Sequence, residues 1–320
     1  METLKKELYD EIEKHIFKYL DSHVNLILKI GNYILESGGK RIRPILVLAF
    51  ARALGKENLE NLYPLAVAME YLHTASLLHD DVVDEADTRR GRPSANRVFG
   101  NDTVVLTGDY MYANALHIFS TYGTMDMIRN VSDAVKRMAE GQLLELKKIG
   151  DIEMSEEEYF KILEGKTAVL FASCCYIGTA FATEEQELKE SAYNYGLKIG
   201  LAFQLIDDLL DYTADREKLG KPVCNDLREG KLTYPLLSIM DNLTEDERSF
   251  IKSVIRDLNP DLDNIEKVKN IIKIKGGFDK TYQKAKELIN EALMELENFP
   301  ENKYSKDLEM LAKYIVERDF

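Results

Sequence analysis

Two segments of this sequence carry the same cluster of three aspartates inside a long apolar run. The clusters consist of Asp80, Asp81 and Asp84, and of Asp207, Asp208 and Asp211. On a helix, residues at positions i and i+4 stand one turn apart on one face, where like charges repel each other. Because the residues around both clusters are apolar, we expect two mostly buried helices whose carboxylates share a partly enclosed site with something cationic.

The paired clusters predict a metal site. One cluster alone is compatible with a solvated helix face, but burying two without partners would cost many kcal/mol. Hard divalent cations with oxygen ligands remove that cost, and Mg²⁺ is usually held by a few carboxylates together with phosphate oxygens of a substrate. The sequence therefore indicates magnesium and a phosphorylated substrate.

A compact basic turn, formed by Lys40, Arg41 and Arg43, follows two glycines and opens an apolar helix. Free N–H groups and the positive end of the helix dipole favour phosphate at such a place. A solvated helix start is the alternative interpretation. His73 lies two turns before Asp80 on the same helix face, so it either contacts the ligand or is a hydrogen-bonded core residue.

Further basic residues follow the first cluster. Arg89 and Arg90 belong to a loop rich in arginine, glycine and proline. Their guanidinium groups can grip a diphosphate that metal ions also hold, through forked, charge-assisted hydrogen bonds. Surface ion pairs with Glu85 and Asp87 are the alternative interpretation.

Two later segments also suit a phosphorylated ligand. Lys166 and Thr167 are predicted to open a helix, although the spacing of a P-loop is missing. The uncharged stretch 167–183 falls just short of a membrane span, so it is predicted to be a buried core helix. The irregular segment 213–231 is predicted to be a mobile lid over the site.

The remaining chain shows apolar residues at helical spacing, and no β alternation of any length appears. Hydrophobic residues make up 45% of the 320 residues, which is enough to bury a substantial core. We therefore expect one all-α domain over residues 1–320, with a central cavity between helices where metal sites are commonly built.

The net charge and the cysteines indicate which partners and which cellular compartment to expect. The formal net charge of -14 argues against nucleic acid as the main partner. Cys174, Cys175 and Cys224 suit reduced core thiols better than disulfides or a zinc site. The first 21 residues are charge-rich and amphipathic, unlike a secretory signal. We expect a cytoplasmic protein without a transmembrane segment.

The ordered set of motifs resembles the trans-isoprenyl diphosphate synthases, or polyprenyl synthases. The resemblance covers residues 38–231 and extends more loosely to the C-terminus. It rests on the segment 39–44, His73, the two aspartate clusters, Arg89-Arg90-Gly91, the segment 165–167, Phe203-Gln204 and Gly230-Lys231. Each motif is short, but their order and spacing together are specific to the family.

The resemblance implies a bundle of roughly ten or more mostly antiparallel helices around a deep central cavity, in a homodimer or higher homo-oligomer. It implies isopentenyl diphosphate and allylic prenyl diphosphates as substrates, with three Mg²⁺ ions per active site. The main metal ligands would be Asp80, Asp84 and Asp207, supported by Asp81, Asp208 and Asp211. The contacts to the allylic diphosphate would be Arg89, Lys166, Thr167, Gln204, Lys221 and Lys231. The contacts to isopentenyl diphosphate would be Lys40, Arg43, His73 and Arg90.

The activity implied is prenyl transfer by ionisation, condensation and elimination. In this family the residues four and five before the first aspartate set the pocket floor, and here they are Ser76 and Ala75. Because both are small, we expect a product longer than farnesyl, with geranylgeranyl diphosphate first and Leu72 or Met69 ending its growth. Ordinary core packing is the alternative role of these four residues, and a longer-chain polyprenyl diphosphate is the alternative product.

Two other functional classes are compatible with the fold. A class I terpene cyclase also binds its diphosphate through metal ions, but it needs no second diphosphate site. The predicted isopentenyl diphosphate site therefore argues against this class. A non-catalytic regulatory subunit of a prenyl synthase needs neither aspartate cluster, and both clusters are intact here.

Overall fold

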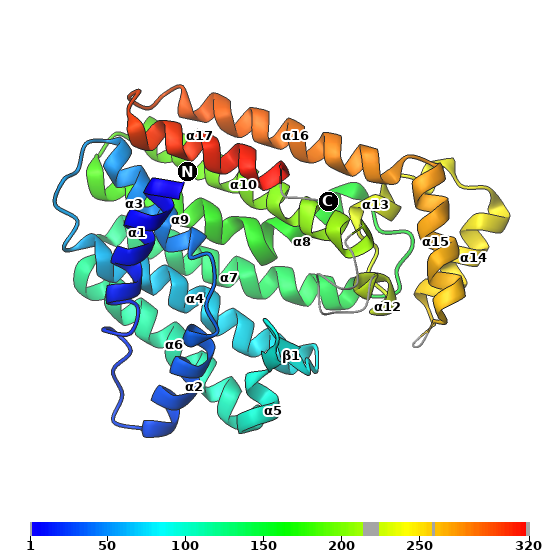
Figure 1. The fold of residues 1–320 in the computed structure, drawn as a ribbon, viewed down its shortest axis with the longest axis horizontal. Helices are drawn as coiled ribbons and strands as arrows, with labels where there is room; N and C mark the ends of the chain where they lie inside the picture. Colours follow the sequence, from blue (N-terminus) through cyan, green and yellow to red (C-terminus); the bar gives the residue numbers. More distant parts are fainter. Residues whose placement is uncertain (1, 214–223, 258–259, 318–320) are drawn as a thin grey trace. The chain divides into compact units, whose positions relative to one another are not determined.

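The structure is a computed structural model that describes residues 2–213, 224–257 and 260–317. Its regular structure is almost entirely helical, which confirms the predicted all-α class (Figure 1). The longer helices are α1 (Glu2–His15), α2 (Asn25–Glu36), α3 (Ile42–Ala53), α4 (Leu62–Val83), α6 (Asn101–Tyr122), α7 (Met125–Lys148), α8 (Glu156–Leu163), α9 (Val169–Ala182), α10 (Gln186–Thr213), α14 (Glu245–Ile255), α15 (Leu262–Ile274), α16 (Gly277–Leu296) and α17 (Lys303–Val316). The shorter elements are β1 (Thr88–Arg89), β2 (Arg92–Pro93), α5 (Ala95–Phe99), the π-helix η1 (Glu164–Ala168), α12 (Asn225–Arg228), α13 (Tyr234–Leu237) and the 3₁₀ turn η2 (Met240–Asn242).

The chain forms two compact units, which are described separately below. Unit 1 consists of Met1–Val135, Leu170–Tyr193 and Leu296–Met310. Unit 2 consists of Lys136–Val169, Asn194–Glu295 and Leu311–Phe320. The boundaries fall inside α7, α9, α10, α16 and α17, so each of these helices contributes residues to both units. The single domain over residues 1–320 stays a prediction.

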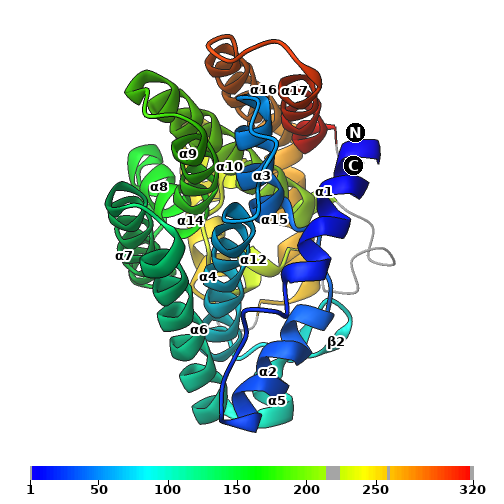
Figure 2. The ribbon, with the colours of Figure 1, turned by 90° about the vertical axis from the view of Figure 1, so that its left-hand side faces the viewer.

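Helix α4 forms the middle of unit 1, where it packs against α1, α3, α5 and α6. Figure 2 shows α4 and α6 running side by side. The consecutive residues Leu65, Ala66, Val67 and Ala68 are all fully buried although successive helix positions point about 100° apart, as expected for a helix with neighbours on several sides. Gly108 of α6 allows close packing, because a Cβ atom there would overlap the ring of His79. The first aspartate cluster therefore lies at the end of a rigid core helix.

The start of α3 is fixed by a buried ion network rather than by a capping side chain. Arg41 adopts a left-handed conformation with φ of 48° directly before the helix. Its Nη1 lies 3.0 Å from Glu70 Oε1 on α4, its Nε lies 2.7 Å from Glu13 Oε1 on α1, and its Nη2 donates to the carbonyl of Leu35. Pro44 lies in the first turn of α3, as the sequence predicts.

A tight hairpin follows α4. Thr88 pairs with Pro93, and Arg89 pairs with Arg92, in an antiparallel register. The two turn residues between the strands, Arg90 and Gly91, both have positive φ, at 53° and 75°. That combination is typical of a type I′ turn, whose twist matches the flanking strands. The hairpin thus presents Arg90 at its tip.

In unit 2, η1 continues α8 without a break, while α14 packs against α12 and α15. Helix α8 begins with a capping box, in which Ser155 and Glu158 each accept a hydrogen bond from the other's backbone N–H. Thr244 and Glu247 form the same arrangement at the start of α14. These caps fix the starts of two helices in the unit that carries the second aspartate cluster.

The helical stretch Glu156–Ala182 is long and apolar enough to cross a membrane by length and composition alone. However, 83% of its most apolar window is buried inside the protein, which is the behaviour of a core helix. Cys174 and Cys175 within it, and Cys224 elsewhere, are buried free thiols. Burial raises the pKa of all three thiols, so they behave as inert core side chains.

Candidate functional site

The three carboxylates of the first cluster have different surroundings in unit 1. Asp81 is buried, and its Oδ1 accepts hydrogen bonds from Nε and Nη2 of Arg89, each at 2.7 Å. Asp80 is half-buried, whereas Asp84 is exposed and caps the C-terminus of α4. Only Asp80 and Asp84 therefore present partly or fully solvated oxygens, and Asp81 holds the hairpin arginine in place. The alternative interpretation, an ion pair with Glu85 or Asp87, does not apply to Arg89, which pairs with Asp81, but Arg97 of the same loop pairs with Asp87 at 2.8 Å.

Four arginines surround His73, which lies half-buried on α4. Burial lowers the pKa of its imidazole well below the usual value, and the positive charges of Arg43, Arg90, Arg89 and Arg41 lower it further. His73 is therefore neutral at physiological pH. A neutral ring among guanidinium groups can offer a hydrogen bond to an anion without adding a charge.

Contacts with neighbouring residues hold two of these arginines, Arg43 and Arg90, in position. The guanidinium carbon of Arg43 lies 4.6 Å from the centre of the Phe171 ring, a cation–π contact. The guanidinium of Arg90 reaches the backbone of Gly39, where a Cβ atom would lie 3.0 Å from Nη1. Lys40 is exposed beside this glycine. Arg41, which the sequence groups with the anion-binding residues, instead points inward to Glu70 and Glu13.

The second cluster lies on α10 in unit 2. Asp208 is buried, and its two oxygens accept hydrogen bonds from the hydroxyl of Tyr159 and from Nε2 of Gln204, the latter at 3.0 Å. Thr167 donates a hydrogen bond of 3.1 Å to Oε1 of Gln204. Burial, together with the charges of Asp207 and Glu145, raises the pKa of Asp208 to about 7, although both hydrogen bonds oppose this shift. Hydrogen bonds thus connect Tyr159, Asp208, Gln204 and Thr167 in series, and they hold the side chain of Thr167 in position.

Asp211 has a structural role. Its two oxygens accept hydrogen bonds from the backbone N–H groups of Asn225, at 3.0 Å, and Asp226, at 3.1 Å. Its own carbonyl accepts the N–H of Cys224 at 2.8 Å. Asp211 therefore ties the end of α10 to the start of α12, and the half-buried Asp207 is left as the member of the cluster best suited to bind a cation.

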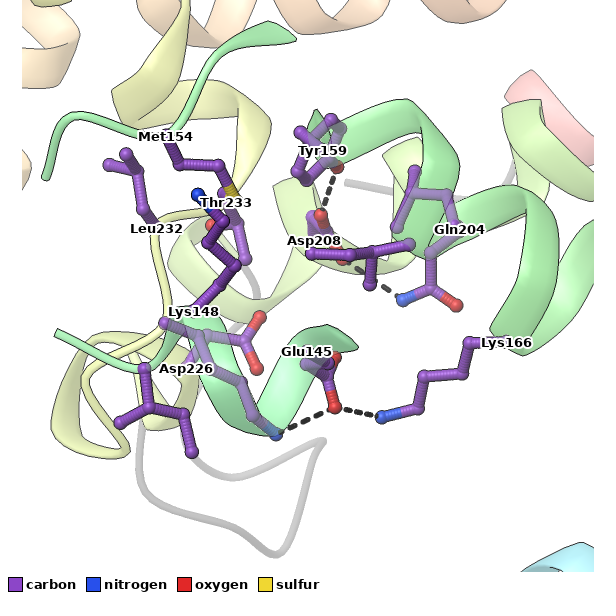
Figure 3. A pocket seen from close by; sticks show the side chains of 14 residues that line it. Glu145, Lys148, Met154, Tyr159, Lys166, Gln204, Asp208, Asp226, Leu232 and Thr233 are labelled. Carbon is purple, nitrogen blue, oxygen red and sulfur yellow. Dashed lines mark hydrogen bonds and ion pairs between the residues drawn. The ribbon is translucent and has the colours of Figure 1, made fainter. Parts of the chain in front are cut away.

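A pocket that is open to solvent lies beside this cluster within unit 2 (Figure 3). Its lining includes Glu145, Lys148, Tyr159, Lys166, Gln204, Asp208, Asp226 and Lys231. Figure 3 shows the carboxylate of Glu145 between two lysine ammonium groups. The distances from its Oε2 are 2.5 Å to Nζ of Lys166 and 4.0 Å to Nζ of Lys231. The pocket thus combines acidic and basic side chains, as a metal-assisted diphosphate site requires.

The two lysines are placed by unusually close backbone contacts. Lys166 lies in the π-helix η1, where Gly165 packs directly on Gly141 of α7. A Cβ atom on Gly165 would lie 2.8 Å from the carbonyl oxygen of Arg137. Near Lys231, the N–H of Gly150 donates to the carbonyl of Gly230 at 2.8 Å. These contacts bring both lysines to the last turns of α7, and π-helices of this kind are frequent at functional sites.

Replacing Gly165 with alanine should therefore damage the protein and its pocket together. We expect a loss of about 2 kcal/mol in the free energy of unfolding, because backbone atoms cannot yield to the added methyl group. If Lys166 contacts the allylic diphosphate, as the family resemblance implies, its displacement should also raise the KM for that substrate. Urea unfolding and steady-state kinetics measure the two effects.

Gly31→Ala is the matched control, since its added Cβ would meet only the end of the flexible Leu20 side chain, at 2.7 Å. Equal losses of stability in both variants would contradict the importance of the Gly141–Gly165 contact.

The structure corrects one argument about Lys166 and Thr167. The sequence predicts that they open a helix, but they lie inside the continuous helical stretch Glu156–Ala182. Their backbone N–H groups are therefore not at a free helix N-terminus. Any contact with phosphate must come from their side chains.

Several residues at the pocket were not predicted. Tyr159, Glu145 and Asp226 line it, and the hydroxyl of Tyr159 binds Asp208 directly. Helical spacing could not single them out, because nothing in the sequence connects α7 or α8 with α10. The paired glycines at 141 and 165 were the only available signal of a close helix contact.

No three His, Cys, Asp or Glu side chains among the described residues already converge as a metal site. The donors are nevertheless carboxylate oxygens, which suit Mg²⁺, and a Mg²⁺ ion usually keeps several ligands for water and substrate phosphate. Asp80, Asp84 and Asp207 fit this chemistry. Lys221 lies outside the described residues.

The residues of the expected pocket floor lie on α4. Met69, Leu72 and Ala75 are fully buried, and Ser76 is half-buried with its hydroxyl donating to the carbonyl of His73 at 2.8 Å. Their role in product length stays a prediction.

Comparisons with known proteins agree on one family. The family model described as polyprenyl synthetase matches residues 24–274. Octaprenyl diphosphate synthase of Escherichia coli is 40% identical over 304 residues, which cover 95% of this chain and 94% of that protein. The structure of a decaprenyl diphosphate synthase from Rhodobacter capsulatus superposes with a TM-score of 0.94 at 33% identity, covering 99% of this chain and 98% of that one. A polyprenyl synthase from Caulobacter crescentus, complexed with calcium and isoprenyl diphosphate, gives 0.92 at 34% identity, covering 99% and 96%.

Proposed function

The chain belongs to the polyprenyl synthetase family, and we propose that it makes a long-chain polyprenyl diphosphate from isopentenyl diphosphate and an allylic diphosphate. It is a prenyltransferase, like the relatives with which it aligns over almost its whole length. The observation that carries the proposed product is the 40% identity with an octaprenyl diphosphate synthase.

The expected product length changes with the comparisons. Geranylgeranyl diphosphate was the first expectation from Ala75 and Ser76, but the relatives named above are octaprenyl and decaprenyl diphosphate synthases. These names favour the longer-chain alternative. The small side chain of Ala75 is compatible with either length, since it blocks neither.

The proposal assigns the two groups of basic residues to two substrates. Lys40, Arg43, Arg90 and neutral His73 in unit 1 would hold isopentenyl diphosphate by charge-assisted hydrogen bonds. Lys166 and Lys231 in unit 2, with Arg89 and the side chains of Thr167 and Gln204, would hold the allylic diphosphate. Lys221 is proposed for the same group from its motif alone.

Asp80, Asp84 and Asp207 would bind the metal, with three ions carried over from the family resemblance. Bound Mg²⁺ would neutralise the charge that develops on the leaving diphosphate. Asp81, Asp208 and Asp211 support the site through Arg89, Tyr159 and the backbone of α12 respectively.

The reaction breaks the C–O bond of the allylic diphosphate and releases pyrophosphate. The allylic carbocation is attacked by the double bond of isopentenyl diphosphate, and loss of one proton restores an alkene. Lys166 and Lys231 can stabilise the negative charge on the departing group, because both reach the same pocket. The product is one isoprene unit longer and again carries an allylic diphosphate, so the cycle can repeat.

An assay of chain length tests this function. With Mg²⁺, an allylic starter and labelled isopentenyl diphosphate, the wild-type chain should yield products longer than geranylgeranyl diphosphate on chromatography. Ala75→Phe should shorten them, because a bulky ring on the buried face of α4 would block the growing chain. Ala139→Phe adds the same ring at an exposed position of α7 and should leave the length unchanged. A wild-type product that stops at geranylgeranyl diphosphate would contradict the long-chain assignment.

The proposal also includes a homodimer and a cytoplasmic location. Helix α6 exposes Val105, Leu106 and Leu116, with Leu106 65% accessible, and such an apolar stripe favours a homodimer interface. The buried, unmodified thiols of Cys174, Cys175 and Cys224 fit the reducing cytoplasm.

A further inference from the structure

Glu145 occupies a position that the metal and substrate roles above leave unexplained. It lies on α7 in unit 2, away from both aspartate motifs in sequence, and its side chain is only 17% exposed. Its carboxylate pairs with Lys166 at 2.5 Å and lies 4.0 Å from Lys231. Both lysines belong to the group proposed to bind the allylic diphosphate. A carboxylate therefore occupies the place where these ammonium groups converge.

Backbone contacts place Lys166 and Lys231 close to Glu145, so the flexibility of the side chains is not the only factor that brings these groups together. The contact of Gly165 with Gly141 fixes Lys166 one turn of α7 from Glu145. The hydrogen bond from Gly150 to Gly230 fixes the residue before Lys231 at the end of the same helix. Glu145 is therefore the close partner of Lys166, whereas Lys231 pairs with Glu229 at 2.6 Å and lies at the edge of ion-pair distance from Glu145.

The charges of the pocket support this view. Burial alone would lower the pKa of Lys231, but the negative charges of Glu145 and Glu229 raise it. A carboxylate and a diphosphate offer the same kind of group, an anionic oxygen, so they compete for the same N–H donors.

We propose that Glu145 competes with the diphosphate for these ammonium groups: it pairs with Lys166, and together with Glu229 it holds Lys231, until a diphosphate binds and takes its place. The competition weakens the binding of the allylic diphosphate and of released pyrophosphate alike. Glu145 is a positioning residue in this scheme, because it acts through the lysines and not on the reacting carbon. The inference deepens the proposed function and depends on its assignment of the two lysines.

The test compares the binding of pyrophosphate to the wild-type chain and to Glu145→Gln by calorimetry, with EDTA present and no metal. Glutamine keeps the shape but removes the competing charge. The variant should bind pyrophosphate about tenfold more tightly, which corresponds to about 1.4 kcal/mol. Its KM for the allylic diphosphate should fall similarly, while its KM for isopentenyl diphosphate stays the same. Unchanged or weaker pyrophosphate binding would overturn the proposal.

Two further variants separate a general effect of charge from the specific position of the Glu145 carboxylate. Glu291→Gln removes one negative charge from the same unit, at the partly exposed carboxylate that pairs with Lys198, and should change the affinity by less than about twofold because exposed charges are screened. Glu145→Asp keeps the charge but shortens its reach, so it should tighten binding less than Glu145→Gln and in the same direction. Weaker pyrophosphate binding by Glu145→Asp would overturn the proposal even if the glutamine variant does not fold.

The outcomes also separate this inference from the proposed function. A wild-type chain that neither binds pyrophosphate nor uses an allylic diphosphate would contradict the proposed function itself. A wild-type chain that binds both, without tightening in Glu145→Gln, would contradict only the role of Glu145. Loss of the Mg²⁺-dependent part of pyrophosphate binding, with the metal-free affinity unchanged, would make Glu145 a metal ligand and likewise overturn the proposal.

Discussion

Asp207→Asn should lower kcat/KM for prenyl transfer by about a thousandfold, because it removes the charge of a proposed metal ligand whose effect would be greatest when the diphosphate leaves. Asparagine keeps the size of the side chain, and Asp207 is only half-buried, so the fold should be retained. Steady-state kinetics at saturating Mg²⁺, together with the circular dichroism spectrum, measure the two properties.

Asp211→Asn is the matched control from the same motif. Its carboxylate accepts backbone N–H groups of Asn225 and Asp226, so its replacement should cost about 1 kcal/mol of stability, as for a lost helix cap. Its kinetic loss should be far smaller than that of Asp207→Asn. Equal kinetic losses in the two variants would contradict the division of roles within this cluster.

Glu70→Ala should lower the free energy of unfolding by about 3 kcal/mol, because it leaves the buried guanidinium of Arg41 short of a partner. The side chains of Arg41 and Glu70 are only 2% and 5% exposed. The start of α3 should loosen as well, which would raise the KM for isopentenyl diphosphate through Arg43. Urea unfolding followed by circular dichroism measures the stability.

Glu13→Ala provides the comparison, since it removes the second partner of Arg41. The Glu13 side chain is 32% exposed, so water can replace part of the lost interaction, and we expect a loss of about 1 kcal/mol. A Glu13 variant less stable than the Glu70 variant would show that the inner pair is not the main anchor of α3.

Local patterns predicted the helices that carry the site. The spacing of apolar residues predicts helices in the remaining chain, and the structure has α6, α7 and α8 there. The aspartate clusters fall on α4 and α10, except that Asp84 caps its helix rather than continuing it. Spacing within one helix is a local property, so the sequence expresses it directly.

Partners that come from distant segments could not be predicted in this way. Arg89 was expected to bind diphosphate, and the structure adds that Asp81 holds it. Nothing in the local sequence indicates that Tyr159 hydrogen-bonds Asp208 or that Glu145 pairs with Lys166. These contacts depend on how helices pack, and only the glycines at 141 and 165 hint at that packing. The proposed lid over 213–231 stays a prediction, because residues 214–223 lie outside the described part.

The π-helix at Glu164–Ala168 has a consequence for how this chain tolerates changes in length. A π-helical turn holds one residue more than an α-helical turn, so it is equivalent to a single insertion that the helix has absorbed. Deleting one residue there would let regular α-helix run from α8 into α9. Later side chains would then keep their facing, whereas deleting one residue within α8 or α9 would rotate each later position by roughly 100°, the angle per residue of an α-helix. Indels in the regular helices of this stretch therefore change which side chains face the pocket, whereas η1 can gain or lose one residue without that change.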